Sequence, residues 1–237
     1  MRKLKTPAVI IAFDHGFEHG PQSYPDVDMD PKRIAKIALK GGADALMMNS
    51  GSWEIVGNTG KLVRIVKLTG KSSLSKREMQ EMHTTVADAM RYKPDVFACT
   101  VYPGSNDEQH MLRLAAYIKE EAHKRKLPVL GIVYPRTPTR YNERDVMYAA
   151  RIGSEIGFDF IKTYHPKNSG FANVVKAAFK PVFASGGKLE HRDVYLQTVE
   201  EVMKSGAAGV AVGRNVWARD DAVSFLKKVV RIVKKKR

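Results

Sequence analysis

Eight short runs of apolar and β-branched residues constrain the fold more than any other feature of this 237-residue chain. Gaps of helix length separate the runs, which is typical of repeated βα units around a parallel sheet. Eight such units close a (β/α)8 (TIM) barrel, and a barrel of this kind fills about 200 to 250 residues. We therefore expect an α/β protein with one barrel domain over residues 1–237. The expected strands are residues 8–14, 45–49, 63–69, 95–102, 128–134, 158–164, 181–186 and 209–213.

The segments between these runs have the periodicity of amphipathic helices. Asp30 and Pro31 supply an N-cap and a first-turn proline, and Gly157 and Gly206 stand where helices are expected to end. Residues 70–83 are polar and long for a connection, so we expect a loop above the third strand. The expected helices are residues 31–39, 107–124, 143–156, 171–179, 193–204 and 220–232.

The formal net charge of +15 fits either nucleic acid or small polyanions such as sugar phosphates. Much of the excess comes from both ends of the chain, where we expect solvated helix faces. No aromatic residues alternate with the basic runs, as a stacking platform for bases requires. Charge alone does not identify the polyanion, but we expect no nucleic acid as a partner; a phosphorylated sugar is the expectation to which the site residues below lead.

Cysteine usage and hydropathy indicate the compartment. Cys99 is the single cysteine, so no disulfide can form within the chain, and its apolar run indicates a core residue. The first seven residues contain no apolar segment typical of a secretion signal, and no run approaches the length that spans a bilayer. We expect a cytoplasmic protein without a membrane partner.

Polar residues interrupt four of the apolar runs. Asp14 ends the first strand, Lys67 lies in the third, Tyr134 ends the fifth and Lys162 lies in the sixth. All four stand near the carboxyl ends of their strands, where active sites of (β/α)8 barrels are built. We expect them to meet there.

Lys162 carries the most specific chemistry of the four. Burying an unpaired ammonium group is costly and lowers its pKa, and a neutral lysine is a nucleophile that attacks a ketone to form an imine. The alternative is a structural lysine in a salt bridge to Asp14 or Asp159. Tyr134 is then a candidate proton donor and acceptor, although an ordinary buried tyrosine would have the same pattern. Asp14 can orient or deprotonate a substrate hydroxyl, or hold the lysine charge.

Glycine-rich segments follow the seventh and eighth expected strands, where phosphate is commonly bound in this fold. Glycines let backbone N–H groups approach an anion, and an arginine adds charge-assisted hydrogen bonds. We expect a phosphate site made of Ser185, Gly186, Gly187, Gly213 and Arg214.

Residues 15–19 match the zinc-binding spacing H-x-x-E-H, a motif that acts from a helix. Here the motif follows a strand directly and is accompanied by Gly16, Gly20 and Pro21. We therefore expect that His15 and His19 do not share a helical face, and that no metal is bound.

Seven segments in this order resemble the archaeal-type class I fructose-bisphosphate aldolases, in a larger group that also holds aminodeoxyheptulosonate synthases. The segments are residues 13–21, 67–71, 100–105, 134–136, 161–164, 185–187 and 211–217. The resemblance implies reversible cleavage of fructose 1,6-bisphosphate to dihydroxyacetone phosphate and glyceraldehyde 3-phosphate, with no cofactor and no metal. It also implies a homo-oligomer, often a ring of ten subunits in this family.

The same resemblance implies a role for each site residue. Lys162 matches the Schiff-base lysine, Tyr134 the acid/base tyrosine, and Asp14 the aspartate at the reacting hydroxyls. The Ser185, Gly186, Gly187, Gly213 and Arg214 set matches the site for the phosphate of the ketone half, and Lys67, Arg136 and His15 are further substrate-binding candidates. The family pattern changes at residues 165–168, after Lys162. The alternatives are a synthase-like transaldolase and a non-catalytic basic barrel.

Overall fold

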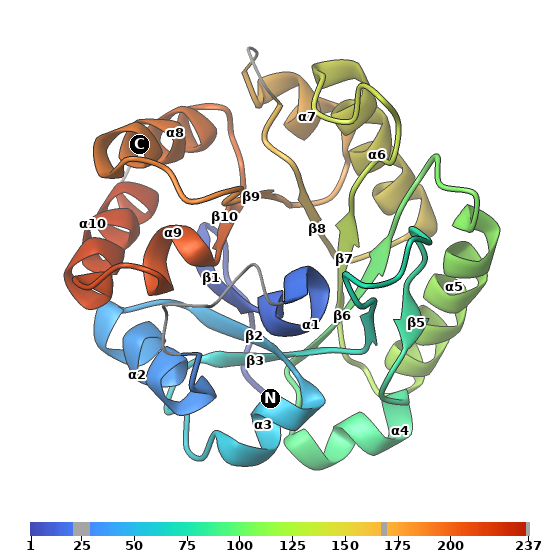
Figure 1. Cartoon of the computed structure of the whole chain (residues 1–237), viewed down its shortest axis with the longest axis horizontal. Helices are drawn as coiled ribbons and strands as arrows, with labels where there is room; N and C mark the ends of the chain where they lie inside the picture. Colours follow the sequence, from blue (N-terminus) through green and yellow to red (C-terminus); the bar gives the residue numbers. More distant parts are fainter. Residues whose placement is uncertain (21–28, 167–169, 236–237) are drawn as a thin grey trace.

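The computed structural model describes residues 1–20, 29–166 and 170–235, and its eight parallel strands close into one barrel. The barrel closes where the first strand pairs with the last, Ala8 beside Gly209 (Figure 1). The strand order around it is β1-β10-β9-β8-β7-β6-β3-β2. Every expected strand is present, which confirms the (β/α)8 prediction. The strands are β1 (Ala8–Phe13), β2 (Ala45–Asn49), β3 (Val63–Lys67), β6 (Val96–Val101), β7 (Val129–Val133), β8 (Phe160–Thr163), β9 (Val182–Ser185) and β10 (Gly209–Val212).

The six expected helices form the outer ring seen in Figure 1. They are α2 (Pro31–Gly41), α5 (Glu108–Lys124), α6 (Glu143–Ile156), α7 (Ala172–Ala177), α8 (Arg192–Lys204) and α10 (Ala222–Lys234). Their ends follow the sequence signals: the Asp30 side chain accepts from the backbone N–H of Lys32 at 2.9 Å, and Gly157 ends α6 in the left-handed conformation.

Several short elements were not expected. They are α1 (His15–His19), α3 (Ser50–Ile55), α4 (Val86–Ala89), a 3-10 turn (Met90–Tyr92) and α9 (Arg214–Trp217). Each is one or two turns long, too short for a helical period to show in the sequence. Two of them, α1 and α9, follow β1 and β10 directly and therefore stand at the carboxyl end of the barrel.

The expectation of a loop over residues 70–83 holds for residues 71–80, which form no helix or strand, but not for the ends of the segment. The ends of this segment pair as a small antiparallel ladder between β4 (Thr69–Gly70) and β5 (Glu81–Met82). The backbone N–H of His83 also donates to the Leu68 carbonyl at 3.0 Å. Two-residue strands are too short for an alternating pattern to reveal. We call residues 70–82 the covering segment.

The side chains of the barrel strands form two apolar layers. On β1, Ile10 and Ala12 point into the barrel, whereas Val9 and Ile11 pack against the helices. Because side chains alternate along a strand, the residue two positions after an interior residue is also interior. This rule places the polar residues near the ends of β1, β3, β7 and β8 inside the barrel.

Candidate active site

The interior alternation brings Asp14, Lys67, Tyr134 and Lys162 to the carboxyl end of the barrel. Ala12, Ile65 and Ile132 are interior residues, and Asp14, Lys67 and Tyr134 follow each of them by two positions. Lys162 pairs with Ile132 on one side and with Phe183 on the other. The expectation that these four side chains come from separate strands into one region is therefore confirmed.

Lys67 is held by two carboxylates. Its Nζ atom lies 2.8 Å from Oδ2 of Asp14 and also contacts the carboxylate of Glu18 on α1. Burial would lower the pKa of Lys67, but Asp14 and Glu18 raise it above the ordinary value. Burial would likewise raise the pKa of Asp14, but Lys67 and then Lys162 hold it well below its usual range. The pair is therefore an ammonium and a carboxylate at neutral pH.

Lys162 has a different environment. The residue is only 5% exposed, and among the described residues no hydrogen bond or ion pair reaches its Nζ atom. Burial lowers the pKa of Lys162, and the positive charge of Lys67 adds to this effect, while Asp14 opposes it. The salt-bridge alternative was wrong in the part of the chain that the structure describes, because Asp14 pairs with Lys67 and Asp159 accepts the Val129 backbone N–H at 2.9 Å.

Tyr134 lies near the loop after β9, where the side chain of Ser185 opposes the effect of burial on the pKa of its hydroxyl. Its ring stacks face to face on Tyr164 with centroids 4.1 Å apart. Burial raises the pKa of Tyr134 above its ordinary value. The hydroxyl is therefore protonated at neutral pH and able to donate a proton.

The two glycine-rich loops lie side by side, because β9 and β10 are neighbours in the barrel. The Nδ2 atom of Asn215 donates to the carbonyls of Gly186 and Lys188, both at 2.6 Å, and so ties the loop after β9 to α9. Beside them, the Nε atom of Arg214 is buried and has no hydrogen-bond partner among the described residues. Burial lowers the pKa of Arg214. The loops thus bring the expected phosphate-binding residues together.

The expectation that His15 and His19 do not share a helical face was wrong. The motif forms helix α1, and the two imidazole rings lie 5.3 Å apart, so they do share a helical face. Glu18, the acidic residue of the motif, contacts Lys67 instead of a histidine. In the part of the chain that the structure describes, no cluster of histidine, cysteine and acidic residues has the arrangement of a metal site. Pro21, which was included in this reading, lies outside the described residues.

His15 itself is closely packed. Its ring meets Trp217 edge-on with centroids 5.2 Å apart, and its Nδ1 atom lies 3.6 Å from Oδ1 of Asp14. A Cβ atom on Gly213 would lie 2.3 Å from Cε1 of His15, so only glycine fits there. Burial lowers the pKa of His15 to about 3. The imidazole is therefore neutral at neutral pH.

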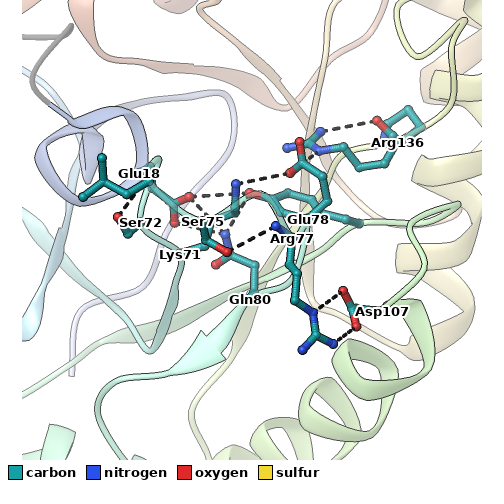
Figure 2. Close-up of polar contacts among 12 residues, drawn as sticks. Glu18, Lys71, Ser72, Ser75, Arg77, Glu78, Gln80, Asp107 and Arg136 are labelled. Atoms are coloured by element: carbon teal, nitrogen blue, oxygen red, sulfur yellow. Dashed lines mark hydrogen bonds and ion pairs between the residues drawn. The ribbon is translucent and has the colours of Figure 1, made fainter.

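The covering segment adds residues that the sequence did not reveal. The Nε2 atom of Gln80 lies 3.0 Å from Oε2 of Glu18 and 2.8 Å from the hydroxyl of Tyr102, which puts the segment in contact with the Lys67 network (Figure 2). Glu78 contacts Arg136, one of the expected substrate-binding residues. The motif at residues 15–19 was the one signal for Glu18, whereas nothing in the sequence marked Gln80 or Glu78.

Together the fold and these residues define a class of protein. A closed parallel barrel with an unpaired lysine of lowered pKa at the carboxyl ends of its strands, beside a protonated tyrosine and a fixed carboxylate, is suited to imine chemistry on a carbonyl substrate. The chain belongs to the DeoC/LacD family of aldolases, whose model matches residues 8–219.

Individual relatives agree with the family assignment. The class 1 fructose-bisphosphate aldolase of Thermoproteus tenax is 38% identical, over 95% of this chain and 89% of its own length. The class 1 enzyme of Halobacterium salinarum is 32% identical, over 92% of this chain and 87% of its own. An archaeal fructose-1,6-bisphosphate aldolase, solved with its catalytic lysine bound to the carbinolamine intermediate of the substrate, superposes with a TM-score of 0.91. It is 34% identical, with coverage of 95% of this chain and 93% of that one.

Proposed function

We propose that this chain is a class I fructose-1,6-bisphosphate aldolase, which cleaves its substrate reversibly to dihydroxyacetone phosphate and glyceraldehyde 3-phosphate. The observation that carries the proposal is the unpaired Nζ atom of Lys162, buried beside the Lys67–Asp14 pair in a barrel of the aldolase family. The class 1 aldolase relatives and the solved carbinolamine intermediate support it.

In this proposal Lys162 is the nucleophile. Its neutral amine adds to the ketone carbon of the substrate, and loss of water gives a protonated imine. The imine withdraws the electron pair of the neighbouring carbon–carbon bond as that bond breaks, while the proton of the substrate hydroxyl passes to a base. Protonation of the resulting enamine and hydrolysis of the imine release dihydroxyacetone phosphate and restore the amine.

Tyr134 and Asp14 serve the proton transfers. Burial keeps the phenol of Tyr134 protonated at rest, so it can donate to the enamine carbon or to the leaving hydroxyl and recover the proton later. Lys67 keeps Asp14 ionised, so its carboxylate can accept a hydrogen bond from a reacting hydroxyl. Lys67 itself is best suited to fixing this carboxylate, because two acidic groups already hold its ammonium.

The phosphate of the ketone half is assigned to the loops after β9 and β10. The proposed contacts are the backbone and side chain of Ser185, the backbones of Gly186, Gly187 and Gly213, and the guanidinium of Arg214. The buried, unpartnered Nε atom of Arg214 supports this assignment, since a buried donor is costly until it finds an acceptor. His15, which lies against Gly213, and Arg136 complete the proposed substrate-binding set.

We further infer a single catalytic domain over residues 1–237 that requires neither a metal nor an organic cofactor. From the family we also propose a homo-oligomer, the ring of ten named above, that works in the cytoplasm in glycolysis or gluconeogenesis. In the described residues no helix is long and apolar enough to cross a membrane. Light scattering of the purified protein would give the subunit number.

Borohydride reduction in the presence of dihydroxyacetone phosphate tests the proposed mechanism. We expect intact mass spectrometry to show one covalent adduct, and peptide mapping to place it on Lys162. Lys162→Met should give no adduct, whereas the exposed Lys61→Met is a matched control that should give the full yield. Absence of the adduct in the unaltered protein, or loss of cleavage activity in EDTA, would contradict the proposal.

A further inference from the structure

Glu78 lies at the mouth of the barrel between two cations. Its Oε2 atom is 3.1 Å from Nε of Arg136 and 3.6 Å from Nζ of Lys71 (Figure 2). Arg136 follows β7, Lys71 follows β4, and Glu78 comes from the middle of the covering segment. Two stretches of chain, the covering segment with Lys71 and Glu78 and the stretch after β7 with Arg136, thus meet in one charged cluster.

Arg136 is held in place and both cations are largely shielded from solvent, whereas the carboxylate is accessible. The Arg136 guanidinium stacks on the Tyr102 ring at 3.7 Å, and its Nη1 atom donates to the hydroxyl of Tyr164 at 2.8 Å. The side chains of Arg136 and Lys71 are 12% and 13% exposed, but that of Glu78 is 42% exposed. An ion pair with one partner in solvent is worth little, so Glu78 can leave its partners at small cost.

The backbone that carries Glu78 is anchored on both sides. Arg77 pairs with Asp107 on one side of it, with Nε 3.2 Å from Oδ2. On the other side, Gln80 donates to Glu18 and to the Tyr102 hydroxyl. Only the side chain of Glu78 therefore needs to move for the two cations to become available.

The cluster lies close to the proposed chemistry. Tyr164, which accepts the hydrogen bond from Arg136, stacks face to face on Tyr134. An anion bound by Arg136 would consequently lie one aromatic ring away from the proposed acid/base residue. Arg136 follows β7 and Lys162 lies in the neighbouring strand β8, so both stand at the carboxyl end of the barrel.

We propose that Glu78 is an exchangeable counter-ion, which neutralises Lys71 and Arg136 in the free protein and yields them to the distal phosphate of the substrate. This inference rests on the proposed aldolase function and adds a residue that determines selectivity for bisphosphorylated sugars. With Glu78 in place, two cations and one carboxylate leave one positive charge. A phosphate dianion in its place neutralises the cluster and offers three acceptor oxygens to the guanidinium and the ammonium.

Glu78 also explains how two largely shielded cations are tolerated before substrate arrives. Burial would raise the pKa of Glu78, but Arg136 and then Lys71 lower it, so the carboxylate is charged at neutral pH and balances them. A substrate with one phosphate, on the ketone half, leaves Glu78 where it is. A bisphosphate must displace Glu78, and the free energy that this displacement costs lowers the affinity for the bisphosphate.

The test compares fructose 1,6-bisphosphate with fructose 1-phosphate as substrates of the full chain. In Glu78→Gln, KM for the bisphosphate should fall by about three- to tenfold, because no ion pair has to be broken first. KM for fructose 1-phosphate should stay within about twofold of the unaltered value. Glu81→Gln is the matched control: its carboxylate, on β5, lies 3.2 Å from His110, and the ratio of the two kcat/KM values should not change.

Arg136→Met supplies the opposite change. It should lower the preference for the bisphosphate, and Glu78→Gln added to Arg136→Met should restore little of it. If Glu78→Gln fails to fold, Glu78→Asp replaces it, because aspartate keeps the charge on a shorter side chain. Glu78→Asp should raise the preference for the bisphosphate, by a smaller factor than that expected for Glu78→Gln.

An unchanged or reduced bisphosphate preference in a folded Glu78→Gln or Glu78→Asp protein would overturn the counter-ion role while leaving the aldolase function intact. If the unaltered protein cleaves neither sugar, the proposed function fails, and titration calorimetry with inorganic phosphate decides the inference by itself. Tighter phosphate binding by Glu78→Gln than by Glu81→Gln would support it, and equal binding would refute it.

Discussion

The Nζ atom of Lys67 lies 2.8 Å from Oδ2 of Asp14, although Lys162 is the lysine with the features of a nucleophile. The pairing gives the two buried lysines different pKa shifts. One keeps its proton because acidic partners hold it, and the other has a lowered pKa because it is buried near that fixed positive charge. Asp14 and Glu18 thus keep Lys67 charged, while Lys162 is left as the buried lysine with a lowered pKa.

Lys67→Met should slow imine formation at neutral pH without abolishing it. Removing the positive charge near Lys162 and leaving Asp14 and Glu18 unpaired both raise the pKa of Lys162, so less of its amine is neutral. The pH profile of borohydride trapping should therefore move to higher pH. Loss of a partner from a buried ion pair should also lower the free energy of unfolding by about 3 to 5 kcal/mol.

Lys61→Met is the control for this shift, because it removes an exposed charge before β3. This variant should keep the pH profile of trapping seen in the unaltered protein. A Lys67→Met profile that stays in place, or moves to lower pH, would show that Lys67 does not tune Lys162.

Tyr134→Phe should separate imine formation from turnover. The variant keeps Lys162 and the stacking on Tyr164, so trapping with dihydroxyacetone phosphate should still give the adduct. Turnover should fall by roughly 10²-fold or more, as expected when a general acid/base group is lost. Tyr141→Phe, which keeps the ring that contacts Tyr164, is the control and should retain near-normal turnover. Equal rates for Tyr134→Phe and the unaltered protein would remove Tyr134 from the mechanism.

The stability of the protein should decrease as pH falls below about 6.5, in part because of His15. In the unfolded chain a histidine takes up a proton near pH 6.5, whereas burial lowers the pKa of His15 in the fold to about 3. Between these two pH values the unfolded state therefore binds more protons than the folded state, so the free energy of unfolding decreases as the pH decreases. This one group should account for roughly 1 to 2 kcal/mol between pH 7 and pH 5.

Urea unfolding of His15→Gln at both pH values checks this contribution. The variant should lose less stability on acidification than the unaltered protein, because glutamine does not titrate. His191→Gln, at an exposed histidine, should lose as much as the unaltered protein. The same acid sensitivity in His15→Gln would mean that other buried groups, such as His83 with its pKa lowered to about 4, cause the whole effect.

The sequence predicted the barrel and its interior polar positions because both depend on local regularities. Runs of buried residues at helix-length intervals specify βα units, and alternation along a strand specifies which side chains point inward. Asp14, Lys67, Tyr134 and Lys162 could therefore be placed at one end of the barrel before any contact was known. Which lysine pairs with Asp14 could not, since both occupy interior positions and the choice depends on distances across the barrel.

The contacts of the covering segment and the ladder at its ends could not be predicted, for a related reason. Gln80 meets Glu18 across 62 positions of sequence, and β4 and β5 contain two residues each, so neither leaves a local pattern. Helix α1 was missed because one turn after a strand, with glycine inside it, has the composition of a loop. The changed loop after Lys162 includes Lys167 and Asn168, which lie outside the described residues.

Gly213→Ala should weaken binding of the ketone phosphate and destabilise the fold. The added Cβ would lie 2.3 Å from the His15 ring and 3.1 Å from the carbonyl of Ala12, closer than side chains pack. His15 cannot retreat easily because its ring already meets Trp217 edge-on. The loop that carries Arg214 must therefore shift, which we expect to cost about 1 to 3 kcal/mol, as overpacking of a filled site does.

Two measurements separate the expected effects of Gly213→Ala. KM for the substrate should rise by tenfold or more, since about 1.4 kcal/mol of lost binding is a factor of ten, and the free energy of unfolding in urea should fall. Gly51→Ala is the matched control: Gly51 lies in α3 with nothing within 4 Å of the added atom, so it should leave KM unchanged and stabilise the helix by about 0.5 to 1 kcal/mol. A Gly213→Ala protein that is destabilised but keeps its KM would show that the loop after β10 supports the fold and does not hold the phosphate.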